Sequence, residues 1–207
     1  MIYMTKPILL ILILAFSSCA QISYSEAIPL LRTAIVGVSD IEIDSEFIES
    51  REYSFIKVKL GRSAVTIMTL STISEDGIYK WVNASGESIY TFNGKIIKSE
   101  GLVYDIEMFN FSNFKLPDVQ SPDELTSSND AMLFNPRGFV TQSSTVKFSK
   151  INKSNGLLEY REEVSSEGFR WDFVNFYKVD KQSKRVVESD QYIHPKYPKV
   201  EVSFFYK

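Results

Sequence analysis

Apolar and polar residues alternate with a period of two in several stretches of the chain, and this pattern restricts its fold more than any other feature. The stretch YSFIKVKLG places Ile56, Val58 and Leu60 on one face and two lysines on the other. Similar alternation recurs in residues 101–109, 168–179 and 200–207. Successive side chains of a β-strand point to opposite faces, so each stretch is predicted to be a strand with one buried face.

Turn-forming sequences separate these strands. EDG precedes Ile78, NASGE begins at Asn83, FNGK contains Asn93-Gly94, and KSNG precedes Leu157. Asn-Gly between two strand-like runs is typical of a β-hairpin, because a type I′ turn requires positive φ at both central positions. The sequence therefore predicts an all-β fold, an antiparallel meander folded into a sandwich or a partly closed barrel. Trp81 and Trp171 are expected to be buried in it.

Residues 112–139 depart from this pattern. They are rich in proline, serine and acidic residues and show little periodicity, which predicts a long irregular connection. Such connections are often functional, and we expect Asn135 and Arg137 to belong to a binding loop, because arginine can form a bidentate contact with a carboxylate. The alternative is a solvated structural loop in which Arg137 pairs with an acidic neighbour such as Asp130.

The N-terminal stretch KPILLILILAFSSCA joins a short apolar run to the one cysteine of the chain, Cys19. The run is about half of the roughly 20 residues that a membrane-spanning helix needs, and its length is typical of a signal peptide. Small residues directly before the cysteine resemble a bacterial lipobox. Residues 1–18 are therefore predicted to be a lipoprotein signal peptide and residues 19–207 a single β-rich domain, anchored to the membrane by a lipid on Cys19. The alternative is an ordinary secretory signal.

Two further expectations concern the segment that follows. Ala20, rather than an aspartate, follows the cysteine, which by resemblance to known lipoproteins implies sorting to the outer membrane, with the domain facing the periplasm. SYSEAIPLLRTAIVG predicts a short N-terminal helix over residues 25–36, with Ser25 as its N-cap. This helix is expected to pack on the domain, and the alternative is that it lies on the membrane surface.

Composition and motifs exclude several classes of function. The net charge of −3 argues against a nucleic-acid partner, and a hydrophobic fraction of 44% argues against disorder. The one histidine, His194, lies beside a proline, and the sequence contains no nucleophile elbow, zinc-protease motif or P-loop. Adjacent carboxylates such as Glu162-Glu163 point to opposite faces of a strand. We therefore expect no enzyme activity, no metal and no cofactor.

Two blocks of sequence carry a resemblance to a known family. Residues 79–102 contain, in order, a tryptophan, a turn, an aliphatic strand, Asn-Gly, a basic strand and Gly-Leu. Residues 177–207 contain a strand, Ser189-x-Gln191, two prolines and a terminal strand, and residues 51–61 give a weaker match. This ordered combination resembles the YjbF/GfcB lipoproteins, which are encoded among group 4 capsule and exopolysaccharide secretion genes.

The resemblance implies a non-enzymatic accessory factor in capsule or exopolysaccharide assembly and export, which would contact other export proteins or the glycan. The alternative function is a periplasmic carrier of an apolar, acyl-chain ligand. A continuous apolar cavity would favour the carrier, whereas an aromatic surface groove would favour glycan binding. The residues that carry the family motifs are expected mainly to specify the fold: Trp81, Asn93, Gly94, Gly101, Gln191 and Pro195.

Overall fold

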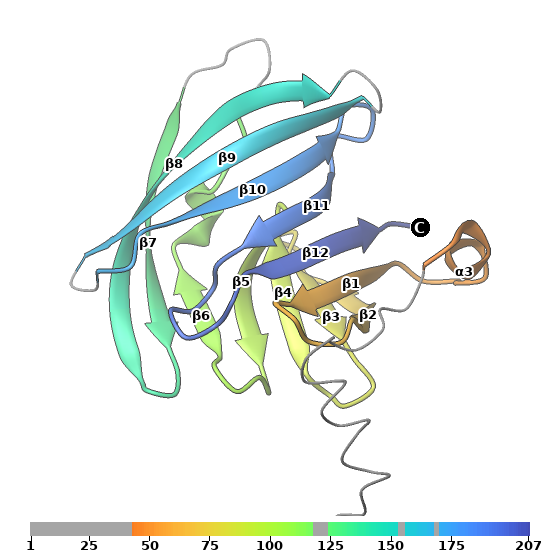
Figure 1. Cartoon of the computed structure of the whole chain (residues 1–207), viewed down its shortest axis with the longest axis horizontal. Coiled ribbons are helices and arrows are strands. Elements are labelled where there is room, and N and C mark those ends of the chain that lie inside the picture. Colours follow the sequence, from red (N-terminus) through yellow and green to blue (C-terminus); the bar gives the residue numbers. More distant parts are fainter. Residues whose placement is uncertain (1–42, 118–123, 153–155, 168–169) are drawn as a thin grey trace, which may run out of the picture. The chain divides into compact units, whose positions relative to one another are not determined.

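A computed structural model of the chain describes residues 43–117, 124–152, 156–167 and 170–207. Within these residues, twelve antiparallel strands follow one another in sequence order around a barrel (Figure 1). The last strand pairs with the first along six residues of each, which closes the sheet. The expected all-β meander is confirmed, and it forms a closed barrel.

The strands of the first half are short, and those of the second half include the longest of the barrel. The first six are β1 (Phe55–Leu60), β2 (Thr66–Ile73), β3 (Tyr79–Val82), β4 (Ser88–Phe92), β5 (Lys95–Glu100) and β6 (Ile106–Phe109). The other six are β7 (Leu125–Leu133), β8 (Gly138–Asn152), β9 (Leu157–Glu167), β10 (Phe173–Asp180), β11 (Val186–Gln191) and β12 (Val200–Phe205).

Helices contribute little to the described part of the chain. α3 (Ser45–Glu49) precedes β1, and its N-cap Asp44 accepts a hydrogen bond of 2.7 Å from the backbone N–H of Phe47. A single 3₁₀ turn, η1 (Phe111–Asn113), follows β6. No helix in the described ranges has both the length and the apolar character needed to span a bilayer. Cys19 and the helix predicted over residues 25–36 lie outside the described residues.

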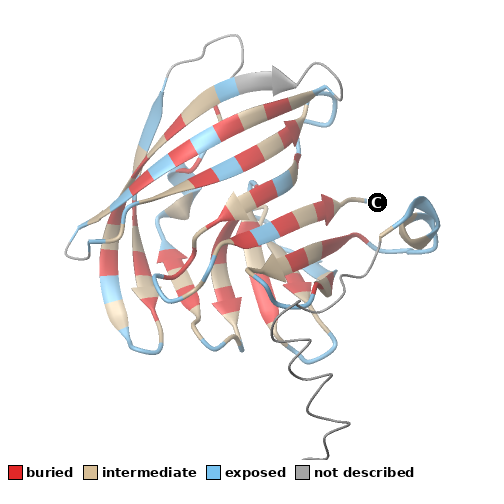
Figure 2. Ribbon diagram, viewed as in Figure 1, coloured by how far each residue is buried: buried red, intermediate tan, exposed pale blue. Residues whose placement is uncertain are grey.

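The strands that close the barrel bury the faces predicted from their alternation. Ile56 and Val58 of β1 and Val200, Val202 and Phe204 of β12 are all buried. Figure 2 shows this alternation of buried and more exposed residues along the strands. The turns predicted at EDG, NASGE and FNGK are also confirmed, whereas most of KSNG lies outside the described residues. In the Asn93-Gly94 turn both residues have positive φ, 49° and 78°, as a type I′ turn requires.

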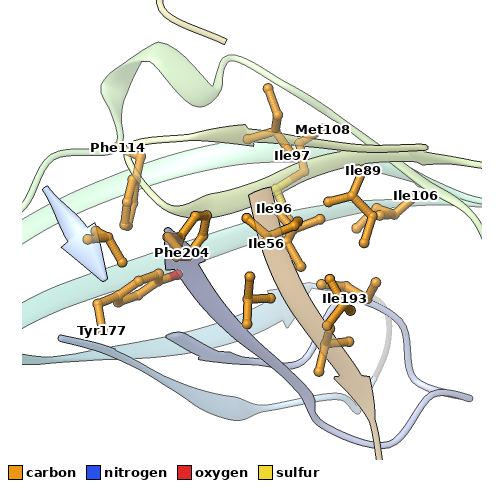
Figure 3. Close-up of a cluster of buried hydrophobic side chains, with 14 of the residues drawn as sticks. Ile56, Ile89, Ile96, Ile97, Ile106, Met108, Phe114, Tyr177, Ile193 and Phe204 are labelled. Atoms are coloured by element: carbon orange, nitrogen blue, oxygen red, sulfur yellow. The ribbon is translucent and has the colours of Figure 1, made fainter. Parts of the chain in front are cut away.

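Large side chains from separate strands fill the interior. Trp81 is fully buried, as predicted, and its indole N–H donates a hydrogen bond of 2.9 Å to the hydroxyl of Thr91. Phe114, which follows η1, packs against Tyr177 with ring centroids 5.4 Å apart (Figure 3). The irregular segment after β6 therefore supplies part of the core.

Two sequence predictions are wrong. Trp171 is half-buried rather than buried, because β10 begins only at Phe173 and Trp171 lies before the pleated region. Residues 112–139 are not one long connection, since β7 occupies residues 125–133 and β8 begins at residue 138. The alternation of β7 is hidden because its inward face carries a polar side chain, Asn129, which lies beside Gln142 of β8 in the barrel interior.

Candidate functional site

An aromatic groove of about 640 Å³ lies on the outer face of β10 and β11 and the loop that leads to β12. Inward positions of β10 are Asn175, Tyr177 and Val179, so Val174 and Phe176 point outward into this groove. The remaining aromatic and charged residues come from the segment before β10, the first residue of β10, β11 and the β11–β12 connection. The residues that define the aromatic groove here are Trp171, Asp172, Phe173, Phe176, Asp190, Tyr192, Pro195, Tyr197 and Lys199.

Ring contacts hold the groove's aromatic side chains in place. The rings of Trp171 and Phe173 are 4.4 Å apart between centroids, and that of Phe173 is 6.1 Å from Tyr192. Phe176 is 47% exposed although it is a phenylalanine. An apolar ring left open to solvent beside three others is typical of a binding surface rather than of a monomer's ordinary exterior.

Charged side chains border these rings. Lys199 donates a hydrogen bond of 2.8 Å to Asp190 and also lies 3.2 Å from Glu201. The hydrogen bond to Asp190 raises the pKa of Lys199, so its ammonium stays charged at neutral pH. The groove thus combines apolar ring faces with a fixed pair of opposite charges, which can donate and accept hydrogen bonds at its border.

A buried polar cluster lies directly behind the groove, inside the barrel. Glu162 of β9 accepts hydrogen bonds from Lys95 of β5 at 2.5 Å, from Asn175 at 2.8 Å and from Tyr177 at 2.7 Å. The side-chain oxygen of Asn175 in turn accepts a hydrogen bond of 2.8 Å from the backbone N–H of Tyr192. The cluster therefore ties the backbone of a groove residue to the interior.

Electrostatics keep the Glu162 carboxylate ionised. Burial by itself would raise the pKa of Glu162, but the Lys95 ammonium and the hydrogen bonds from Asn175 and Tyr177 outweigh it and lower that pKa. Burial and the adjacent carboxylate raise the pKa of Tyr177 well above its usual value. Glu162 is thus a fixed, fully paired anion, which suits a structural role better than proton transfer.

The candidate loop residues Asn135 and Arg137 lie elsewhere, in the turn between β7 and β8. Asn135 donates a hydrogen bond of 3.1 Å to the carbonyl oxygen of Val103, and the guanidinium of Arg137 lies 3.7 Å from the sulfur of Met132. Neither residue lines the aromatic groove. The alternative pairing of Arg137 with Asp130 does not form, and Asp130 accepts a hydrogen bond of 2.7 Å from Thr141.

A smaller, apolar hollow of about 240 Å³ lies at one end of the barrel interior. Val58, Met68, Ile89, Ile193 and Val200 are among the residues that line it. Ligand pockets usually range from about 300 to 1,000 Å³, so this hollow lies below that range and the aromatic groove lies within it.

Comparison with known proteins assigns the chain to a family. Residues 29–205 match the family described as group 4 capsule polysaccharide lipoprotein gfcB, YjbF. The chain belongs to this family. Membership associates it with the cell envelope and with capsule polysaccharide. No curated protein matches the chain.

A solved structure shares the fold. The crystal structure of the hypothetical lipoprotein YmcC from Escherichia coli K12 superposes with a TM-score of 0.68 at 20% sequence identity, covering 91% of this chain and 98% of that one. At this identity the likeness concerns the barrel itself.

Gln191, one of the family-motif residues, connects two parts of the barrel that are distant in sequence. Its side-chain oxygen accepts a hydrogen bond of 2.9 Å from the backbone N–H of Ile96, and its amide nitrogen donates one of 2.8 Å to the carbonyl of Gly94. Gln191 is buried, so these bonds satisfy backbone groups that water does not reach. This amide joins β11 to the β4–β5 hairpin.

The other family-motif residues divide into two groups. Asn93 and Gly101 occupy positive-φ turns, and the backbone N–H of Gly101 donates a hydrogen bond of 2.9 Å to Asp105. Trp81 fills the core. Pro195, by contrast, is exposed and lines the aromatic groove.

The one histidine of the chain is buried in the loop after β11. Its ring stacks on Tyr104 at 5.1 Å, and its Nδ1 accepts a hydrogen bond of 3.1 Å from the backbone N–H of Lys196. Burial, together with the nearby Lys196 ammonium, lowers the pKa of His194. No group of three His, Cys, Asp or Glu side chains within the described ranges could hold a metal ion.

Sequence reasoning missed the groove as a site. The alternation placed Trp171 and Phe173 on a buried face, and Tyr192 and Tyr197 had no assigned role. The available signal was aromatic density close to charged residues, in WDF at residues 171–173 and in DQYIHPKY at residues 190–197. Nothing in the order of residues indicated that these two segments meet on one outer surface.

Proposed function

We propose that this protein is an outer-membrane lipoprotein that acts as a non-enzymatic accessory factor in capsule or exopolysaccharide assembly and export, with its barrel facing the periplasm. We further propose that it contacts the glycan through the aromatic groove. Family membership supports a role in capsule or exopolysaccharide export, and the aromatic groove supports direct contact with a sugar chain.

The chemistry of the groove suits a saccharide. A pyranose ring has apolar C–H faces that can pack on aromatic rings, and hydroxyl groups around its edge that need hydrogen-bond partners. Trp171, Phe173 and Tyr192 supply adjacent rings, and Asp190 and Lys199 supply an acceptor and a donor beside them. A groove on the outside of a barrel, unlike a closed cavity, also leaves room for a long polymer to continue past the site.

A non-enzymatic role is part of the proposal. Glu162 is held by Lys95, Asn175 and Tyr177, and His194 is stacked under Tyr104, so neither is placed to exchange a proton with a bound sugar. The carrier alternative receives less support, because the apolar hollow of about 240 Å³ is smaller than ordinary ligand pockets.

Complementation of a deletion strain tests the proposal. The strain should lose surface polysaccharide or produce less of it, and the wild-type gene should restore the amount. The double variant Trp171→Ala/Tyr192→Ala should remain folded and reach the envelope but restore little polysaccharide. Phe139→Ala, which removes an exposed aromatic ring that is not part of the groove, is the matched control and should restore it fully.

Two outcomes would count against this function. Unchanged polysaccharide in the deletion strain would remove the protein from the process altogether. Full restoration by the double variant, at normal protein levels, would leave the export role standing but would show that the groove does not make the essential contact.

A further inference from the structure

A second hollow, here called the basic pocket, lies at the end of the barrel where β10 turns into β11. The β10–β11 turn and the C-terminal end of β12 lie at the same end of their strands (Figure 1), whereas the aromatic groove is formed at the start of β10 and the end of β11. The basic pocket measures about 370 Å³. Its walls include Lys115, Lys184, Arg185, Tyr79, Tyr206 and the Asn93-Gly94 turn.

The charge of the basic pocket is unbalanced. Lys115, Lys184 and Arg185 line it together, and none of its described lining residues is a carboxylate. In the part of the chain that the structure describes, none of these three cations forms an ion pair. Asp180, in the same turn, accepts a hydrogen bond of 2.7 Å from the backbone N–H of Ser183 and is held within the turn. Clustered cations in a concave surface focus a positive potential that attracts anions.

The backbone at Lys184 determines where this side chain lies in the β10–β11 turn. Lys184 has φ of 56°, in the left-handed region that residues other than glycine and asparagine rarely adopt. The turn enforces this conformation, because the backbone N–H of Lys184 donates a hydrogen bond of 2.8 Å to the carbonyl oxygen of Asp180. Glycine would fit this backbone conformation better, but the position is occupied by a lysine, which lines the basic pocket.

The other cation of the turn is fixed by an aromatic ring. The guanidinium of Arg185 lies over the ring of Tyr206 at 5.0 Å from its centroid, and Tyr79 lies against the same ring at 6.1 Å. Burial raises the pKa of Tyr206, so its phenol stays neutral and adds no negative charge. A guanidinium held in one orientation can form paired hydrogen bonds with the two oxygens of a carboxylate or phosphate.

We propose that the basic pocket binds the carboxylate or phosphate group of an acidic sugar, with Lys184 and Arg185 contacting the anion and Tyr79 packing against the sugar ring. This inference rests on the proposed glycan-binding function and names the class of glycan. The sugar ring supplies the apolar face that suits tyrosine, and the anion supplies the charge that three unpaired cations require.

Titration calorimetry of the full-length protein with tetragalacturonate, an oligosaccharide with one carboxylate on each sugar, tests this. Its fully methyl-esterified form, which has the same sugars without the charge, is the comparison ligand. The acidic form should bind at least about tenfold more tightly, since hydrogen bonds to charged groups are the stronger ones. Its affinity should fall as salt concentration rises. Equal affinity of the two forms would overturn the proposal.

The variant Lys184→Gly separates binding from stability. Glycine removes one cation and also relieves the left-handed backbone, so the thermal midpoint should stay equal or rise while the affinity for tetragalacturonate falls about tenfold. Lys181→Gly, in the same turn but outside the pocket lining, is the matched control and should bind as the wild type does. Unchanged affinity in Lys184→Gly would overturn the proposal.

Two further measurements show which ligand binds and at which site. Inorganic phosphate that binds as tightly as tetragalacturonate would show a site for a free anion, and would overturn the acidic-sugar assignment. If Trp171→Ala/Tyr192→Ala abolished tetragalacturonate binding while Lys184→Gly did not, the aromatic groove would be the acidic-sugar site and the inference about the basic pocket would be wrong. The proposed function is tested separately, by the polysaccharide output of the groove variants. It can therefore stand even if the basic pocket does not bind tetragalacturonate.

Discussion

The ion pair between Lys95 and Glu162 crosses the interior of the barrel, from β5 to β9, with both side chains at most 3% exposed. A barrel of twelve strands encloses more space than the eight-stranded barrels whose interiors side chains just fill, so it has room for an internal polar cluster. Each acceptor of Glu162 is satisfied, by Lys95 on one oxygen and by Asn175 and Tyr177 on the other. Removing one partner of the pair should therefore lower the stability strongly, although the intact pair adds little net stability to the fold.

Replacing Lys95 by methionine should lower the free energy of unfolding by about 3–5 kcal/mol, because it leaves the Glu162 carboxylate buried without its counter-charge. Chemical denaturation of the two proteins would measure this. The control is Glu163→Gln, since Glu163 is the exposed neighbour whose contact with Arg161 lies at the surface, and its effect should stay within about 0.5 kcal/mol. A Lys95→Met protein as stable as the wild type would contradict the assigned role of the pair.

His194 should make stability depend on pH. Burial and Lys196 lower its pKa in the folded protein, below the value of about 6.5 typical of an unfolded chain. Between these two pKa values the unfolded state binds more protons, so stability should fall as pH falls through about 6.5. Asparagine at this position keeps an acceptor for the backbone N–H of Lys196 but does not titrate.

The thermal midpoint at pH 7.5 and at pH 5.5 provides the measurement. The wild type should lose more stability between the two values than His194→Asn does, because only the wild type has an imidazole to protonate. Identical losses in the two proteins would show that other groups account for the pH dependence.

The β4–β5 hairpin is locked against β11 at its turn. A β-carbon at Gly94 would lie 2.5 Å from the Cβ of Val186, so only glycine allows the two strands to approach this closely. The carbonyl of Gly94 also accepts the hydrogen bond from Gln191. The Asn-Gly turn thus does more than reverse the chain, because it brings the hairpin against Gln191, which lies 97 residues further along the chain.

Gly94→Ala tests this packing with a close control. Gly77 has the same φ of 78° but no atom within 4 Å of its β-carbon position, so Gly77→Ala should lower stability by only about 1–2 kcal/mol, the penalty of left-handed backbone. Gly94→Ala should add the effect of a steric clash, about 1–3 kcal/mol more, in chemical denaturation. Equal effects would mean that Val186 moves aside freely.

The described strands form a sheet closed by its own ends, with β1 paired to β12 in register from Phe55 to Leu60. Neither strand then offers an unpaired edge to other proteins, so partners must be recognised by side chains on the outer face or at the ends of the barrel. The aromatic groove and the basic pocket occupy such positions. This arrangement suits the proposed function, in which a lipid holds the domain near a membrane and a polymer passes along its surface.

Cys19→Ser should abolish that anchor. The variant should lack labelled lipid after growth with radioactive palmitate and should leave the membrane fraction, or remain uncleaved, because no thiol is available for acylation. Ser18→Ala, which keeps a small residue before the cysteine, is the control and should be labelled normally. Palmitate label that persists in Cys19→Ser would contradict lipid attachment at this residue.

Local patterns in the chain were sufficient for the fold class. Alternation identified the buried faces of β1 and β12, and glycine with asparagine identified the turns, because pleat and positive φ act over neighbouring residues. The same reasoning failed for β7, whose inward Asn129 is polar, and for Trp171, which lies just outside β10. The first failure arises because burial depends on what lies across the barrel, and the second because alternation does not mark the residue at which a strand begins.

The sequence motifs were also sufficient to identify the family. Two of the motif residues, Gln191 and Gly94, form a hydrogen bond that joins β11 to the β4–β5 hairpin. The aromatic groove and the basic pocket were beyond such reasoning. The groove joins residues 171–176 to residues 190–199, and the basic pocket joins the turn at Asn93 to Lys115, Lys184 and Tyr206. Pairing of β10 with β11 brings the two segments of the groove together, and closure of the sheet brings the distant segments of the basic pocket together.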